Sequence, residues 1–190
     1  MDDPVAARKA EFRKRAFAAR KLAFDAGQGQ AAEILADVLS QHRGRPLAGY
    51  MPMRTEIDPL PAMRVHDGPV AVPVIQGAGL PLKFREWTPG CELIAGEFGA
   101  AIPALGAWIE PEVLIVPLVG FDGRGFRLGY GGGFYDRTLE GLRQRHPTLA
   151  IGFAFSMQEM AEVPIEPTDQ KLDMMVTEKG VTIFDRKAQR

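Results

Sequence analysis

Two helices are predicted at the start of the chain by the spacing of its apolar residues. Asp3 followed by Pro4 has the composition of an N-cap and a first helical residue, and apolar positions then recur at helical spacing until Gly27. A second helix is predicted over residues 30–41, where one apolar stripe comprises Ala31, Ile34, Leu35, Val38 and Leu39.

After these helices the pattern changes to short apolar segments, which are typical of buried strands. They cover residues 47–50, 70–74, 82–87, 113–119, 149–155 and 174–177. Helical stretches near residues 58–65 and 134–145 separate some of them, and this alternation favours a mostly parallel sheet covered by helices. No repeat or long linker divides the chain. We therefore expect an α/β fold, a three-layer α/β/α sandwich in a single domain over residues 1–190.

Composition and charge limit the classes of function. The 23 Lys and Arg residues nearly balance the 24 Asp and Glu residues, so no overall charge attracts the chain to nucleic acid or to an anionic membrane. The single cysteine, Cys91, cannot form an internal disulfide, and the charged amino terminus lacks the apolar core of a signal peptide. No apolar run approaches the roughly 20 residues that a membrane helix needs. We expect a cytoplasmic monomer that binds neither nucleic acid nor membranes.

The densest chemical signal is a glycine-rich stretch between a buried strand and a helix. Residues 120–137 read GFDGRGFRLGYGGGFYDR and contain seven glycines by Gly133. Glycines let backbone N–H groups turn inward together, and the following helix adds free N-terminal donors and the positive end of its dipole. The stretch lacks the P-loop pattern and a true GxGxxG, because Phe134 stands where the last glycine would be.

This stretch predicts a phosphate-binding loop of another kind, and a flexible hairpin with a glycine-rich tip is the alternative. Its place after the apolar segment 113–119 favours the loop, because open α/β sheets bind ligands at the carboxyl ends of their strands. Asp136 and Arg137 fall in the first turn of the next helix and offer a hard oxygen ligand for Mg²⁺ and a cation beside phosphates. Alternatively, Asp136 only complements the helix dipole.

Three further groups of charged residues are candidates for ligand contacts. Lys9 and Arg13 share one face of the basic first helix and could clamp a polyphosphate, although a solvated face is the usual meaning of such a run. Glu56 has no local capping role and could accept two hydrogen bonds from an amino-heterocycle, or it could be a surface glutamate. Asp169 and Asp173 would share one face of a helix or a strand and could support a cation, with simple loop acidity as the alternative.

Other chemistries lack their residues. The three histidines have no metal-ligand spacing, the chain has no GxSxG motif, and it contains only two serines. Phosphoryl chemistry is therefore the best supported.

Taken together, the segments of this chain resemble the 5-formyltetrahydrofolate cyclo-ligase family, also called methenyltetrahydrofolate synthetase. The most specific piece is LGYGGGFYDR (residues 128–137), and the other fragments follow in the family's order: KAEFR (9–13), YMPMRTEID (50–58), LKFREW (82–87), LIAGEFGAAIP (93–103) and VPIEPTDQKLDMMVTEKGV (163–181). The resemblance implies that ATP phosphorylates the N5-formyl oxygen of 5-formyltetrahydrofolate. N10 then attacks the activated carbon, and phosphate leaves to give 5,10-methenyltetrahydrofolate.

The resemblance also implies roles for individual residues. Nucleotide contacts are expected from Lys9, Arg13, Arg127, Leu128, Gly129, Tyr130, Gly131, Gly132, Gly133, Phe134 and Tyr135. Mg²⁺ ligands are expected at Asp136 and Asp169, and a folate contact at Glu56. The walls around the pterin and aminobenzoyl groups would be Met51, Pro52, Trp87 and Phe134, each with an ordinary core position as the alternative.

Two positions depart from the family's pattern. Phe134 stands where tyrosine is frequent, so a hydrogen bond from that hydroxyl is absent. The run Ala101-Ile102-Pro103 stands where a glutamate before the proline is common. Two other classes of protein would also suit a glycine-rich anion loop: a sugar-phosphate isomerase or coenzyme A transferase, and a nucleotide-sensing or folate-storage module without catalysis.

Overall fold

The computed structural model describes residues 4–185, and eight of its strands form one main sheet. The strands are β1 (Leu47–Ala48), β2 (Val70–Val74), β3 (Lys83–Glu86), β6 (Trp108–Ile109), β7 (Val113–Val116), β10 (Leu149–Phe153), β12 (Met174–Thr177) and β13 (Gly180–Ile183). Their order across the sheet is β13-β12-β10-β7-β1-β2-β3-β6. The strands from β12 to β2 are parallel, whereas β13, β3 and β6 join through antiparallel pairs.

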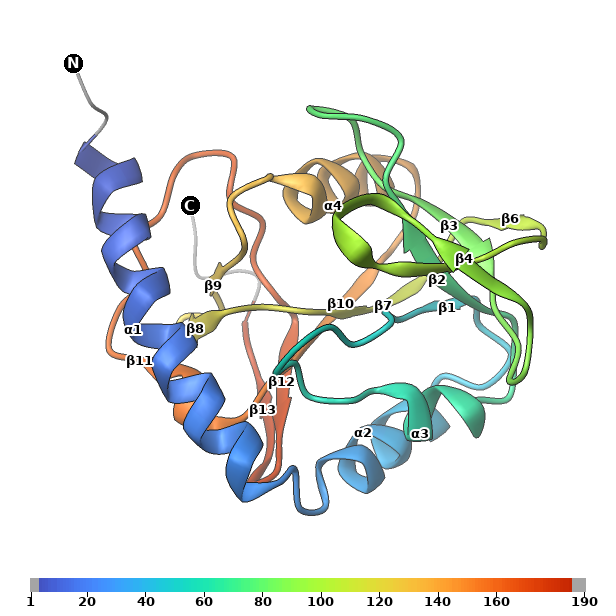
Figure 1. Ribbon diagram of the computed structural model, residues 1–190, viewed down its shortest axis with the longest axis horizontal. Helices are drawn as coiled ribbons and strands as arrows, with labels where there is room; N and C mark the ends of the chain where they lie inside the picture. Colours follow the sequence, from blue (N-terminus) through green and yellow to red (C-terminus); the bar gives the residue numbers. More distant parts are fainter. Residues whose placement is uncertain (1–3, 186–190) are drawn as a thin grey trace.

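Helices cover both faces of this sheet, which confirms the predicted α/β/α layers. Figure 1 shows α2 (Ala31–Ser40) and α3 (Leu60–Arg64) on one side and α4 (Phe134–Arg145) on the other. The apolar stripe of α2 is the buried side of that helix, with Leu35 and Leu39 almost fully enclosed. The stripe forms a helix because residues three and four apart lie on one face, where the sheet removes them from water.

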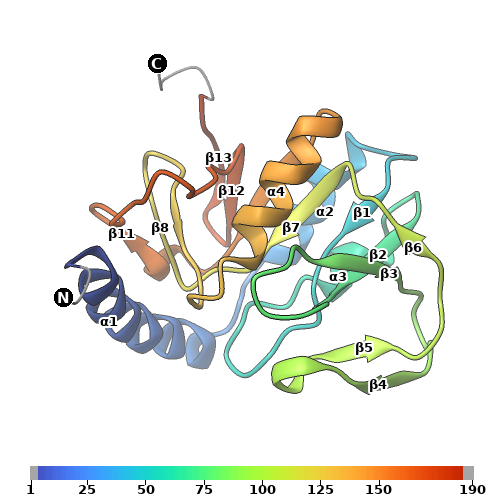
Figure 2. The same cartoon turned by 90° about the horizontal axis from the view of Figure 1, so that it is seen from above.

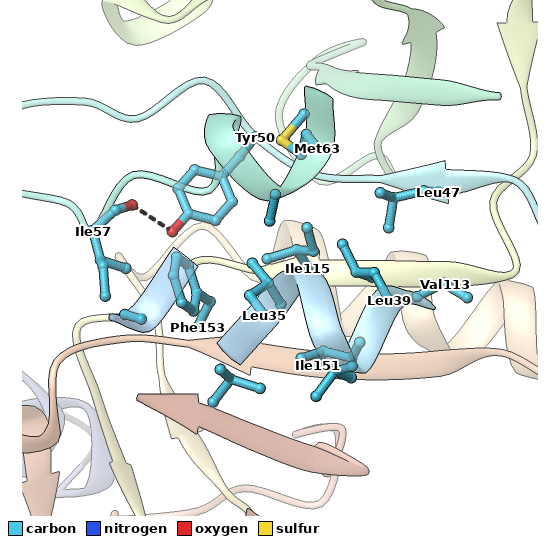
Figure 3. Close-up of a cluster of buried hydrophobic side chains, with 14 of the residues drawn as sticks. Leu35, Leu39, Leu47, Tyr50, Ile57, Met63, Val113, Ile115, Ile151 and Phe153 are labelled. Atoms are coloured by element: carbon cyan, nitrogen blue, oxygen red, sulfur yellow. Dashed lines mark hydrogen bonds between the residues drawn. The ribbon is translucent and has the colours of Figure 1, made fainter. Parts of the chain in front are cut away.

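Strand β7 lies in the middle of the sheet and shows why the layers are stable. Val113 and Ile115 belong to the apolar cluster beside α2, whereas Leu114 and Val116 belong to the cluster beside α4. Successive side chains of a strand point to opposite faces, so a strand covered on both sides is apolar at every position. Figure 3 shows the first cluster, in which side chains of α2 meet Ile115, Ile151 and Phe153.

The first helix, α1 (Pro4–Ala26), lies away from the centre of the sheet, and the expected N-cap at Asp3 is outside the described residues. Figures 1 and 2 show α1 beside a small second sheet. This sheet contains β11 (Glu159–Met160), β8 (Gly120–Asp122) and β9 (Arg127–Leu128). Phe12 of α1 packs against Phe126, Leu128 and Val163, which brings helix α1 to the glycine-rich stretch.

Several predicted strands are shorter in the structure. Residues 113–119 were expected as one strand, but β7 ends at Val116 because Pro117 has no N–H to continue the ladder. Residues 47–50 contribute only Leu47 and Ala48 to a strand. Tyr50 lies just beyond the strand, where its hydroxyl donates a hydrogen bond to the carbonyl of Ile57 at 2.9 Å (Figure 3).

Elements that the apolar pattern did not indicate complete the fold. A hairpin of β4 (Leu93–Ala95) and β5 (Ala101–Pro103) encloses the short helix η1 (Glu97–Gly99), and a second short helix, η2 (Ser156–Gln158), precedes β11. The departure Ala101-Ile102-Pro103 therefore forms β5. Within residues 4–185, no helix combines the length and apolar character required to cross a bilayer.

Candidate functional site

The glycine-rich stretch contains both a hairpin and a loop. Residues 120–128 form the β8–β9 hairpin, so the alternative of a glycine-rich hairpin holds for its first half. The hairpin returns the chain to the end of β7, because the amide of Val119 donates to the carbonyl of Leu128 at 2.7 Å. Residues 129–133 then form the loop itself, which leads directly into α4.

The backbone of this loop needs glycine at two positions. Gly131 has a φ of 104° and Gly133 has a φ of 64°, in the left-handed region that side chains disfavour. Gly133 immediately precedes α4, whose first-turn N–H groups have no partner within the helix. The loop therefore brings compact backbone and a helix N-terminus together, an arrangement suited to binding an anion.

Two arginines hold the carbonyl groups of the loop. Arg13 of α1 donates from Nε to the carbonyl of Gly129 at 2.8 Å, and Arg137 of α4 donates from Nη2 to the carbonyl of Gly132 at 2.5 Å. The guanidinium of Arg13 also lies close to Gly131, 3.4 Å from where a Cβ atom would stand. Helix α1 thus lies beside the loop, which is the condition that a clamp by this helix required. Two fixed positive charges face the loop from opposite ends.

Lys9 lies one helical turn before Arg13 and contacts two carboxylates. Its Nζ lies 2.5 Å from Oε2 of Glu166 and 2.7 Å from Oδ2 of Asp169. Burial alone would lower the pKa of Lys9, but the hydrogen bonds to Asp169 and Glu166 outweigh burial and raise its pKa. Lys9 is therefore a charged group at neutral pH, held next to Arg13 on the same face of α1.

Asp136 has a cationic partner of its own. Its Oδ1 accepts hydrogen bonds from Nη2 of Arg127 at 2.7 Å and from the amide of Gln170 at 2.9 Å. Gln170 directly follows Asp169, so the segment that carries one expected Mg²⁺ ligand, Asp169, also contacts the other, Asp136. Within residues 4–185, no group of three or more His, Cys, Asp or Glu side chains is placed to hold a metal.

The shared helix or strand face predicted for Asp169 and Asp173 is not formed. Residues 169–173 are irregular, so the periodicity of a helix or a strand does not apply to them. Asp169 pairs with Lys9, whereas Asp173 accepts hydrogen bonds from the amide of Ala150 at 2.7 Å and from Arg143 at 3.1 Å. Asp173 therefore supports the start of β12.

Glu56 is buried and belongs to a network that the sequence did not indicate. Its Oε1 accepts a hydrogen bond from the hydroxyl of Tyr130, and its Oε2 accepts one from the amide of Met53 at 2.8 Å. Arg20 of α1 donates to the same tyrosine hydroxyl and, at 3.1 Å, to the hydroxyl of Thr55. The surface alternative for Glu56 is therefore wrong, because its side chain is only 5% exposed.

Tyr135, in the first turn of α4, has a buried hydroxyl oxygen. Among the described residues this buried oxygen has no hydrogen-bond partner. Burial and then the negative charge of Glu56 raise the pKa of Tyr135, while Arg127 acts in the opposite direction. A buried hydroxyl without a partner is costly, so it is a natural contact for a bound ligand or water.

The four expected walls of a folate site do not gather in one cluster. Trp87 is buried with Tyr50 in the cluster on the α2 face, and Met51 packs against that cluster. Phe134 instead packs against the cluster on the α4 face and lies under the guanidinium of Arg137, 5.5 Å from the ring centre. Pro52 is half-buried. Trp87 therefore has the ordinary core position, whereas Phe134 is only half-buried, and contact of any of the four with a ligand stays a prediction.

Most of the chain is similar to one family of known proteins. A model of the 5-formyltetrahydrofolate cyclo-ligase family matches residues 5–178. The 5-formyltetrahydrofolate cyclo-ligase of Escherichia coli K12 is 47% identical over 105 residues, which cover 53% of this chain and 57% of that protein. This alignment thus spans little more than half the length of that relative.

A second relative and a solved structure match over more of their length. The protein of the same name from Mycolicibacterium smegmatis is 32% identical over 149 residues, which cover 72% of this chain and 75% of that protein. The NMR structure of Aquifex aeolicus 5,10-methenyltetrahydrofolate synthetase has a TM-score of 0.72 and 27% identity, and the superposition covers 96% of this chain and 99% of that one.

Proposed function

The chain belongs to the 5-formyltetrahydrofolate cyclo-ligase family, and from that membership we propose that it converts 5-formyltetrahydrofolate to 5,10-methenyltetrahydrofolate with consumption of ATP. One observation carries the proposal: Tyr130 of the glycine-rich loop is hydrogen-bonded to Glu56. This bond joins the proposed phosphate site to the proposed folate contact within a single continuous region.

The nucleotide phosphates would lie on the loop of residues 129–133. Support comes from the left-handed glycines, the helix N-terminus behind them, and the adjacent cations Lys9, Arg13 and Arg137. Phosphate oxygens are matched by planar guanidinium groups and by backbone N–H donors. Binding would exchange the carbonyl contact of Arg13, and the carboxylate contacts of Lys9, for contacts with phosphate.

Asp136 and Asp169 fit a Mg²⁺ ion by the chemistry of their oxygens. Asp169 pairs with Lys9, and the amide of the next residue, Gln170, donates to Asp136. This connection supports a shared role for the carboxylates of Asp136 and Asp169. Their present partners, Lys9 and Arg127, would turn to the phosphates. When bound, the ion would supply positive charge to the β- and γ-phosphates.

The proposed reaction transfers one phosphoryl group and then closes a ring. The formyl oxygen attacks the γ-phosphorus, the bond to the β–γ bridging oxygen breaks, and ADP leaves. The N10 lone pair then attacks the activated carbon, the carbon–oxygen bond breaks, and phosphate leaves as N10 loses its proton. An amide-like oxygen is a poor leaving group, and phosphorylation makes it a good one.

The residues of this chain would contribute position and charge. Glu56 would accept hydrogen bonds from the amino-heterocycle of the pterin, and Lys9 with Arg13 would neutralise charge on the transferred group. The buried hydroxyl of Tyr135, which has no hydrogen-bond partner within residues 4–185, would donate a hydrogen bond to an oxygen of a bound ligand. A strong general base is not required, because the phosphoryl group rather than a proton activates the carbon.

A steady-state absorbance assay for 5,10-methenyltetrahydrofolate, run with and without Mg-ATP, tests the proposal. If the chain is a cyclo-ligase, the methenyl product should form only when ATP and magnesium are both present. A sugar-phosphate isomerase or coenzyme A transferase would form no methenyl product. A sensing or storage module would bind ATP or folate without turnover, and either result would refute the proposal. A cytoplasmic location and a monomeric state stay predictions.

A further inference from the structure

Tyr130 connects two loops that the proposed function assigns to different ligands. It lies in the glycine-rich loop, and its hydroxyl donates a hydrogen bond to Glu56, which is 74 residues away in the sequence. We propose that Tyr130 is a positioning residue that couples nucleotide binding at the glycine-rich loop to folate binding at Glu56. This inference rests on the proposed function and deepens it, because it assigns a role to the contact that joins the two proposed sites.

The tyrosine ring is held from several sides although it is partly exposed. It packs against the ring of Phe17 with the ring centres 5.8 Å apart and the planes inclined by 50°. The guanidinium carbon of Arg20 lies 5.6 Å from the centre of the Tyr130 ring, within the range of a cation–π contact. The orientation of the hydroxyl is therefore determined by α1 as well as by Glu56.

The hydroxyl completes a buried pair of opposite charges. The side chains of Arg20 and Glu56 are 3% and 5% exposed, and their nearest nitrogen and oxygen are 3.9 Å apart. That separation is too long for a direct hydrogen bond. The Tyr130 hydroxyl fills the gap, because it accepts from Arg20 and donates to Glu56. Burial and the charge of Glu56 raise the pKa of Tyr130, which keeps the donating proton in place at neutral pH.

The contact determines how Glu56 is presented. One carboxylate oxygen is held by Tyr130 and the other by the amide of Met53 at 2.8 Å. A phosphate bound to the glycine-rich loop would further restrain the backbone that carries Tyr130, and through the tyrosine it would further restrain the carboxylate of Glu56. An ordered carboxylate loses less conformational freedom when a pterin binds, so the second ligand should bind more tightly. Because coupling between two binding sites is reciprocal, folate should strengthen nucleotide binding by the same factor.

The test measures this factor in the wild-type protein and in two tyrosine variants. The dissociation constant of a non-hydrolysable Mg-ATP analogue is measured with and without saturating 5-formyltetrahydrofolate, and the reverse titration gives the folate constant. In the wild type, saturation with one ligand should lower the dissociation constant of the other by a factor of at least about five. In Tyr130→Phe, which keeps the ring and removes the hydroxyl, the factor should fall below about twofold.

Tyr50→Phe is the matched control. Its hydroxyl is also buried and also bonds to the segment that carries Glu56, but the acceptor is the carbonyl of Ile57 rather than the carboxylate. This variant should lose stability and keep the wild-type coupling factor. An unchanged factor in Tyr130→Phe, or an equal loss in both variants, would overturn the inference.

A second measurement needs no variant. In the wild-type protein, the nucleotide analogue alone should slow hydrogen exchange at the Met53 amide, which donates to Glu56. No slowing would contradict the proposed connection even if Tyr130→Phe failed to fold. The proposed function fails separately, because it requires methenyl product from the wild type. Product formation without coupling would remove only the role of Tyr130.

Discussion

The centre of the sheet and the contact region of α1 are held together by different forces. Val113, Leu114 and Val116 of β7 are completely enclosed among other apolar side chains. Where α1 meets the glycine-rich loop and residues 163–170, which we call the α1 seam, Lys9, Arg13 and Arg20 make charged and polar contacts. Apolar burial is non-directional and cumulative, whereas each polar contact depends on particular partners.

Because of this difference, the apolar core should determine the stability of the fold, and the polar contacts of the α1 seam should determine ligand binding. Buried apolar side chains of the sheet have no polar partner to exchange for a ligand, so we expect the sheet to keep its arrangement when a ligand binds. In the α1 seam, Lys9 and Arg13 hold protein oxygens that phosphate oxygens could replace. Substitutions in the core should therefore change the free energy of unfolding, and substitutions in the seam should mainly change ligand binding.

The largest effect is expected from a truncation in the core. Leu114→Ala should lower the free energy of unfolding by about 2 to 5 kcal/mol, because it leaves a cavity in the middle of the sheet. Urea denaturation measures this loss. The matched control is Leu22→Ala on α1, where the side chain is 63% exposed and the change should stay within about 0.5 kcal/mol. Equal losses at the two sites would contradict the comparison.

Asp136→Ala should reduce kcat/KM about 100-fold or more, or roughly 2.7 kcal/mol, through poor neutralisation of the phosphates. Asp136→Asn sharpens the test, because an amide oxygen can still accept from Arg127 and Gln170 while the negative charge is lost. Rates measured against magnesium concentration distinguish the two roles. If Asp136→Asn keeps the wild-type magnesium response, Asp136 serves only as the partner of Arg127.

Lys9→Ala and Arg13→Ala should each cost about 1.5 to 3 kcal/mol of nucleotide or transition-state binding, the usual scale for hydrogen bonds to charged groups. This corresponds to roughly 10- to 150-fold in nucleotide affinity or kcat/KM. Folate affinity measured without ATP should stay nearly constant.

The control for both variants is Lys21→Ala. Lys21 is a basic residue of the same helix that pairs only at the surface, with Asp25 at 2.9 Å, and its loss should change activity less than about twofold. Similar losses at all three positions would mean that α1 acts through general charge or stability.

Gly132→Val should weaken nucleotide binding by about 5- to 10-fold, or roughly 1 to 1.4 kcal/mol. A Cβ atom at this position would stand 2.6 Å from the ring of Phe134, so the ring or the loop must move. Gly123→Val in the β8–β9 hairpin is the control, because a Cβ atom there meets nothing within 4 Å. Calorimetric titration with the nucleotide analogue should show the loss only for Gly132→Val.

The smallest effect concerns the pH dependence of the α1 seam. The folded-state pKa of Lys9 is raised above its ordinary value of 10.5. A raised pKa stabilises the folded state at lower pH, and this contribution is lost as pH rises through the folded pKa. The stability difference between wild type and Lys9→Met should be constant near neutral pH and should shrink above pH 10.5, by less than about 1 kcal/mol. Denaturation of both proteins across the alkaline range measures this stability difference. A difference that grows with pH would contradict the stabilising ion pairs of Lys9 with Glu166 and Asp169.

The apolar pattern of the sequence determined the layers of the fold. The apolar stripe of α2 and the apolar runs of β2, β7, β10 and β12 predicted which elements are buried, because helix and strand periodicities follow from local backbone geometry. The glycines before α4 likewise predicted a loop at a helix N-terminus, because that conformation is a local property. The boundaries of these elements differ from the prediction. The β8–β9 hairpin occupies the first half of the glycine-rich stretch, and β7 ends at Val116, before Pro117.

The partners of the charged residues were decided only by the tertiary structure. Lys9 and Asp169 are 160 residues apart in the sequence, and Tyr130 and Glu56 are 74 apart. No local period relates such residues, and Arg20 has no sign in the sequence that separates it from the solvated cations of α1. The spacing of Asp169 and Asp173 predicted a shared face, but that segment is irregular and the two carboxylates have different partners. Long-range polar pairing depends on how the helices and loops pack, and that packing assembled the candidate site.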